Sequence, residues 1–214
     1  HLQFVLTEPA DSELLRQVGL DRPLTAPRGT DLVAVVNRNA NPSKIDAFLE
    51  RTIDYRIRWD PETGEATTRV VVTMRNGAPG GGLPVEFIGG RVGNDPGTNR
   101  TELSVLSRFD AIGAMLDGEQ LALGRREDIN GLQRYTVAVD IPPGGSRTVV
   151  LDLEGAVDPG PEYRLTWFSQ PLPNADRARV IVEPVGTTLV GGQSSAAHPL
   201  DDSRVQVLRF LAAT

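Results

Sequence analysis

Five polar side chains in one short stretch have the chemistry to hold a polar ligand: Asn37, Asn39, Asn41, Lys44 and Asp46. Amide side chains both donate and accept hydrogen bonds, and the start of a nearby helix would add unpaired backbone N–H groups. Such a site would suit a polar molecule, for instance a sugar. The same residue types also cap helices and close tight turns. We favour this structural role and carry ligand binding forward as the alternative.

No catalytic residue stands out among the other reactive side chains. Ser194 and Ser195 lie near His198, but no G-x-S-x-G nucleophile elbow surrounds them. The loop over 93–99 offers oxygen ligands without the residue spacing of a defined calcium site. Glycoside hydrolysis needs two carboxylates at a set separation, and nothing in the sequence selects one pair. The candidate carboxylates are Asp54, Glu62, Glu65, Asp110, Asp117, Glu127 and Asp128.

Composition narrows the classes of function further. The chain has 214 residues and no cysteine, which removes disulfides, thiol nucleophiles and zinc–thiolate sites. It has no P-loop, G-x-G-x-x-G or H-E-x-x-H motif, so we predict neither a cofactor nor a metal. The formal net charge of -6 argues against nucleic-acid binding, which needs a basic surface.

The stretch from 37 to 76 predicts a short helix that leads into a long β-hairpin. Asn41 can cap the helix, Pro42 suits its first position, and apolar residues follow at helical spacing up to residue 51. Two segments of alternating apolar and polar residues then indicate strands with one buried face each. The predicted buried positions are Ile53, Tyr55, Ile57 and Trp59 in the first strand and Val70, Val72 and Met74 in the second.

The rest of the chain alternates short strands with Gly/Pro turns, which is typical of a β-sandwich. We expect a hairpin turn at Asp117-Gly118, a short strand over 83–88 and a loop of small residues over 186–200. Ahead of the hairpin, a strand over 2–6, a helix over 11–19 and a strand over 31–36 suggest an α/β piece. The prediction is a mainly β protein with an α/β lead-in over 1–51, an immunoglobulin-like β-sandwich over 52–170 and a C-terminal strand extension over 171–214.

The stretch Asp31-Leu32-Val33, then Asn37-x-Asn39-x-Asn41-Pro42-Ser43-Lys44-Ile45-Asp46, resembles a large bacterial family of uncharacterised exported proteins. Val72-Thr73-Met74-Arg75-Asn76 and Gly82-Leu83-Pro84 are similar to the continuation of that family. The resemblance covers the first half of the chain and is of an actinobacterial type. It implies an N-terminal membrane-spanning helix, an α/β domain of unknown function and a β-rich C-terminal part. It brings no established catalytic residues.

These observations favour two functions. The first is a non-catalytic binding or scaffolding module of the cell envelope, with an envelope protein or a glycan as its partner. The alternative is part of an enzyme of envelope glycan or polysaccharide metabolism, whose active site lies partly upstream. The chain starts at His1 rather than Met, so we expect it to be a segment of a longer protein. We expect that protein to be extracytoplasmic and tethered to the cytoplasmic membrane by a missing upstream segment.

Overall fold

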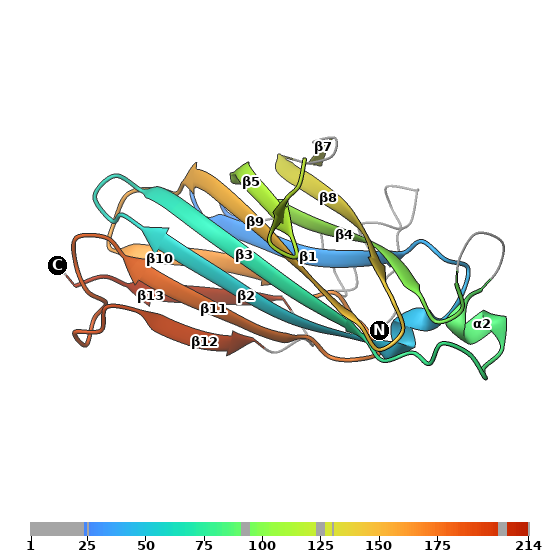
Figure 1. Cartoon of the computed structure of the whole chain (residues 1–214). Coiled ribbons are helices and arrows are strands. Elements are labelled where there is room, and N and C mark those ends of the chain that lie inside the picture. Colours follow the sequence, from blue (N-terminus) through green and yellow to red (C-terminus); the bar gives the residue numbers. More distant parts are fainter. Residues whose placement is uncertain are drawn as a thin grey trace, which may run out of the picture.

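The computed structural model describes residues 24, 26–90, 95–122, 127–129, 131–200 and 205–213. Two mixed β-sheets pack face to face as a sandwich whose strands run along its length (Figure 1). The first sheet contains β1 (Asp31–Asn39), β4 (Asn99–Ser107), β7 (Glu127–Ile129), β8 (Leu132–Ile141), β10 (Glu162–Phe168) and β13 (Gln206–Leu211). The second contains β2 (Leu49–Trp59), β3 (Glu65–Asn76), β5 (Asp110–Leu116), β6 (Glu119–Gln120), β9 (Ser146–Ala156), β11 (Arg177–Pro184) and β12 (Ala196–Leu200).

In both sheets the order of neighbouring strands differs from their order along the chain. The first sheet runs β13-β10-β1-β4-β8-β7, and the second runs β12-β11-β2-β3-β9-β5-β6. Each sheet contains one parallel pair, β1 with β10 and β2 with β11, and all its other pairs are antiparallel. The predicted mainly β sandwich is confirmed. The immunoglobulin-like type is not confirmed, because immunoglobulin sheets are antiparallel throughout.

The β2–β3 hairpin forms as predicted. Ile53, Ile57, Val70 and Val72 are at most 1% exposed and pack in the core between the sheets. Alternation places one face of each strand inside, so the transfer of these apolar side chains out of water stabilises the sandwich. Gly64 closes the turn with φ 78°, and its N–H donates to the carbonyl of Asp60 over 2.8 Å.

The predicted helix up to residue 51 is wrong. Only a single 3-10 turn forms, η1 (Ile45–Phe48), and β2 begins directly at Leu49. Leu49 and Glu50 pair with Asn76 and Arg75 of β3, so hydrogen bonds within the sheet replace those of a helix. Pairing with a long neighbouring strand has overridden the local helical spacing of apolar residues.

The α/β lead-in is also not confirmed. Its described part consists mainly of β1, which lies inside the first sheet between β10 and β4. The buried strand predicted over 31–36 is confirmed, because Leu32 and Ala34 are buried on the outer face and Val33 and Val35 on the inner face. The strand predicted over 2–6 and the helix over 11–19 lie outside the described residues. The division at 51 and 170 stays a prediction.

Two smaller predictions change in the second half of the chain. The segment expected as a strand over 83–88 contains a helical turn instead, α2 (Val85–Ile88), which follows Pro84 and projects at one end of the sandwich (Figure 1). The stretch expected as a loop over 186–200 ends in the edge strand β12. The turn at Asp117-Gly118 is confirmed, with φ 52° and 87° at its two residues.

Candidate functional site

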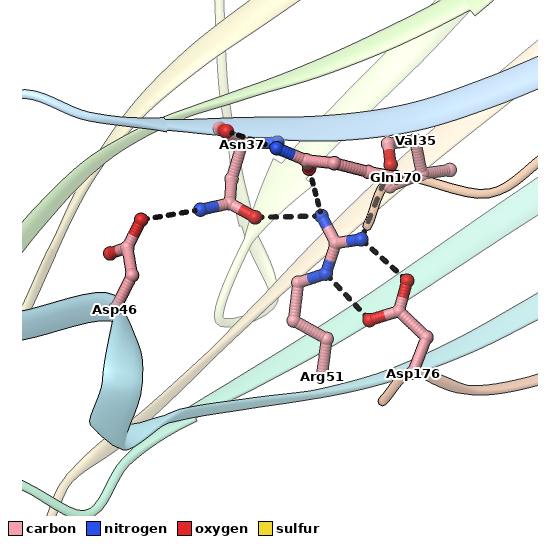
Figure 2. A network of polar contacts seen from close by, with 6 residues as sticks. All are labelled: Val35, Asn37, Asp46, Arg51, Gln170 and Asp176. Atoms are coloured by element: carbon pink, nitrogen blue, oxygen red, sulfur yellow. Dashed lines mark hydrogen bonds and ion pairs between the residues drawn. The ribbon is translucent and has the colours of Figure 1, made fainter. Parts of the chain in front are cut away.

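Arg51 lies at the centre of a buried polar network between the two sheets (Figure 2). Its Nε and Nη2 atoms donate to both carboxylate oxygens of Asp176 over 2.8 and 2.5 Å. Nη1 donates to Asn37 Oδ1 over 2.9 Å and to Gln170 Oε1 over 3.3 Å, and Nη2 also reaches the carbonyl of Val35. These bonds match the five N–H donors of a guanidinium, so the buried charge is fully hydrogen-bonded.

Asn37 extends the network toward η1 and β4. Its Nδ2 donates to Asp46 Oδ2 over 3.2 Å, and Asn99 Nδ2 donates to the other oxygen of Asp46 over 3.0 Å. Gln170 forms a reciprocal pair with the backbone of Asn37, over 2.7 and 2.8 Å. The network therefore joins β1, η1, β2 and β4 to the segment between β10 and β11.

The other three residues of the predicted polar cluster form a separate turn. Asn39 Oδ1 accepts from the N–H of Asn41, and Asn39 Nδ2 donates to the carbonyl of Ser43. Asn41 Nδ2 donates to the carbonyl of Thr98 over 3.2 Å. Lys44 lies beside α2, with Nζ 5.7 Å from the centre of the Phe87 ring.

The predicted cluster of Asn37, Asn39, Asn41, Lys44 and Asp46 is thus divided between two places. In both places the amide groups bond within the protein, as expected for residues that shape a turn. Asn41 was predicted to cap a helix, but the residue that precedes η1 is Lys44 and it makes no side-chain cap bond. Ligand binding by these residues stays a prediction.

Sequence reasoning missed Arg51, Gln170 and Asp176. One signal was present for Arg51, because it has the same strand parity as Ile53 and Tyr55 and would face inward if β2 began earlier. Nothing in the sequence marks Asp176 as its partner, since the two residues are separated by 125 positions.

A second buried cluster contains an acid, Asp31, that forms no ion pair with any residue the structure describes. Asp31 Oδ2 accepts hydrogen bonds from the hydroxyls of Tyr163 and Tyr55, over 2.6 and 2.8 Å. Burial raises the pKa of Asp31 from 3.8 to about 6, although the two hydroxyl bonds act in the opposite direction. Burial and the nearby carboxylate in turn raise the pKa of both tyrosines above the ordinary value. The cluster connects β1, β2 and β10 and lies in the core.

Exposed arginines and partly buried carboxylates form cross-strand pairs on the outer face of the second sheet. Arg69 bonds both oxygens of Asp152 over 2.7 and 2.8 Å, and Arg179 bonds both oxygens of Asp54 over 2.6 and 2.8 Å. The Arg179 bonds hold the pKa of Asp54 below its ordinary value. A hollow of about 500 Å³ opens on this face, and Asp152 and Glu183 are the carboxylates that line it.

The remaining candidates lie apart from these clusters. Ser194, Ser195 and His198 are exposed at the edge of the second sheet, on β12 and the residues before it. Within the described ranges, no group of three or more His, Asp or Glu side chains has the arrangement of a metal site. No helix in the described part of the chain has both the length and the apolar character needed to cross a membrane.

Comparison with known proteins yields a fold but no family. No family model matches the chain, and no curated protein matches it. A solved structure from Legionella pneumophila, a nutrient-binding protein by provisional assignment, is similar with a TM-score of 0.53 at 10% identity. The alignment covers 85% of this chain and 71% of that one. At this identity the likeness supports the β-sandwich fold alone.

Two larger solved structures show a weaker likeness. Yeast LTA4 hydrolase bound to bestatin has a TM-score of 0.40 at 10% identity, with 95% of this chain aligned to 33% of that one. A zinc metallopeptidase from Deinococcus radiodurans has a TM-score of 0.31 at 11% identity, with 77% of this chain aligned to 39% of that one. The alignments therefore span less than half of each of these two chains.

Proposed function

We propose that this chain is a non-catalytic binding or scaffolding module of an extracytoplasmic cell-envelope protein. One observation carries the proposal: the charged and hydrogen-bonding groups that form the two polar clusters lie inside the sandwich. Arg51 and Asp176 bond each other, and Asp31 bonds Tyr55 and Tyr163, at positions that a substrate does not reach. An acid–base site needs its groups within hydrogen-bond reach of the substrate.

The location outside the cytoplasm and the membrane tether are part of this proposal. They rest on the resemblance carried by the Asn37–Asp46 stretch and its continuation into β3. Fractionation of cells that express the full-length protein tests them. Recovery with the membrane, together with digestion by protease added outside the cytoplasmic membrane, is expected. Recovery of the full-length protein in the cytosol would exclude this location.

The enzyme alternative has one feature in its favour. Asp152 and Glu183 come from different strands, β9 and β11, and line the same hollow. Glycosidases use two carboxylates that face a shared cavity. In this structure Asp152 accepts hydrogen bonds from Arg69 at both of its oxygens, so Arg69 already occupies the carboxylate that a substrate would need.

Incubation with labelled peptidoglycan and polysaccharide fragments distinguishes the two functions. We expect no released sugars from the wild-type protein or from the Asp152→Asn and Glu183→Gln variants. Asp117→Asn is a matched control, because Asp117 is a carboxylate on a turn outside the hollow. Turnover that either hollow variant abolishes and the control keeps would establish the enzyme instead.

A further inference from the structure

Strand β13 is the longest of the four edge strands that the described part of the chain contains. Edge strands invite pairing with other chains, and proteins usually shorten them or place proline in them. The edge strands β6 and β7 have two and three residues, and β12 has five residues that include Pro199. In contrast, β13 has six residues, QVLRFL, and no proline.

The side chains of β13 that face outward are apolar at both ends. Val207 is 54% exposed and Leu211 is 51% exposed. Val190, which is 64% exposed, lies beside Leu211 because its N–H donates to the Leu211 carbonyl over 2.8 Å. Between the apolar positions lies Arg209, whose side chain is 63% exposed. The outward pattern is therefore apolar, basic, apolar.

The backbone of β13 offers hydrogen bonds on the side away from β10. Ala212 donates to Pro161, next to β10, whereas the Leu211 carbonyl accepts from Val190 on the other side. Because successive residues of a strand alternate their backbone groups, Val207 and Arg209 point the same way as Leu211. Among the described residues, neither has a backbone partner on that side.

This edge already accepts one short segment of the chain. Leu189 forms an antiparallel bridge with Ala212, flanked by bonds from Val190 to Leu211 and from Ala213 to Thr188. The bridge occupies the C-terminal end of the edge. The N-terminal part, at Val207 and Arg209, has the same geometry without such a segment among the described residues.

The charges around Arg209 indicate what kind of segment would pair with the β13 edge. Glu162 lies between Arg164 and Arg209, with 3.4 Å to each, so one carboxylate is shared by two guanidinium groups. Arg164 and Arg209 also lie directly opposite each other in the sheet, where like charges repel. An additional carboxylate beside Arg209 would give each of the two guanidinium groups its own negative charge.

A second copy of this chain fits the edge poorly. Antiparallel self-pairing that opposes Val207 to Leu211 also opposes Arg209 to its own copy, because residues directly opposite share one face. We propose that the β13 edge binds an extended segment of a partner protein with the pattern apolar, any residue, Asp or Glu, any residue, apolar. This inference rests on the proposed binding function and names its site and its partner.

The experiment measures binding of a fluorescent peptide with the core VTETL to the purified protein. We expect saturable binding, weakened about threefold to tenfold when the central Glu of the peptide becomes Lys. Arg209→Glu reverses this preference. Arg38→Glu is the matched control, because Arg38 is also exposed and paired with a glutamate on the first sheet, and it leaves the preference unchanged.

Amide hydrogen exchange locates the peptide on the edge. Binding slows exchange at Val207 and Arg209 and leaves Leu208 and Phe210 unchanged, because the latter two already face β10. The proposal is overturned if the Arg38 and Arg209 variants weaken peptide binding equally. It is also overturned if the peptide does not slow amide exchange at Val207. A dimer seen by sedimentation and abolished by the peptide also overturns it, since the occupant is then a second copy. If the peptide does not bind and the protein also releases no sugars, the proposed edge site is wrong but the proposed non-catalytic function is not contradicted.

Discussion

The two buried clusters place a carboxylate in the same core by different means. Asp176 is neutralised by a guanidinium that bonds both of its oxygens. Asp31 forms no ion pair with a described residue and is held by two tyrosine hydroxyls. Burial raises its pKa to about 6, although these hydroxyls and the charge of Arg108 act in the opposite direction. Each cluster links both sheets of the sandwich. Asp176 acts on stability as one half of an ion pair, whereas Asp31 makes the stability of the fold depend on its own protonation.

The largest expected effect comes from breaking the ion pair. Arg51→Met leaves the carboxylate of Asp176 buried without its partner and should lower the free energy of unfolding by about 3–5 kcal/mol. Chemical denaturation at neutral pH measures it. Removing both charges, in Arg51→Met with Asp176→Leu, should cost less than the single change, because no unpaired charge remains. A double variant as unstable as the sum of the single changes would contradict this account.

Next in size is the pH dependence that Asp31 creates. Its pKa is about 6 when folded and 3.8 in the unfolded chain, so between these values the folded protein holds a proton that the unfolded chain has released. Its stabilising contribution is complete below the lower value and is lost as the pH rises through the upper one. It amounts to about 3 kcal/mol. Unfolding curves recorded at about pH 4.5, 5.5 and 6.5 should therefore show a free energy of unfolding that falls as the pH rises.

The Asp31→Asn variant isolates this contribution, because its side chain does not titrate. We expect its stability to vary little over the same range. Asp54 and Asp140 have lowered pKa values, so their contribution is lost only at pH values below 3.8 and does not mask the effect. Equal pH dependence in the variant and the wild type would mean that another group is responsible.

A smaller change should follow when one hydroxyl is removed from Asp31. Tyr163→Phe deletes the shorter of the two bonds and should cost about 1–3 kcal/mol at pH 7, where the carboxylate is ionised. The pKa of Asp31 should rise further, which moves the pH dependence upward. Tyr135→Phe is the control, because its hydroxyl bonds the backbone of Phe109 and should leave the pH dependence unchanged.

The smallest effect is expected at the surface. Arg69 bonds Asp152 through two nitrogens, as Arg51 bonds Asp176, but its side chain is 54% exposed. Arg69→Met should therefore cost about 1 kcal/mol or less, and added salt should reduce the difference. Comparison with Arg51→Met tests whether burial, rather than pair geometry, sets the cost. A similar loss of unfolding free energy in the two variants would show that burial does not set the cost.

The alternation of apolar and polar residues was enough to predict the sandwich and most of its inner faces. In β2 and β3 the alternation of apolar and polar residues leaves one register in which Ile57 and Val72 are both buried, because a shift by one residue would expose every apolar side chain. The turn at Asp117-Gly118 was readable from the sequence because it needs a positive φ at both residues, which few residue types adopt.

Contacts between distant segments set where the predicted helix was replaced by a strand and which polar residues came together. The spacing after Pro42 suits a helix, but β3 is long enough to pair with Leu49, and that pairing turns Arg51 toward the core. Its partner Asp176 approaches because β11 lies parallel to β2. A parallel neighbour arrives through a long connection, so local sequence carries no sign of the contact. The buried networks follow from strand order, and strand order depends on the whole chain.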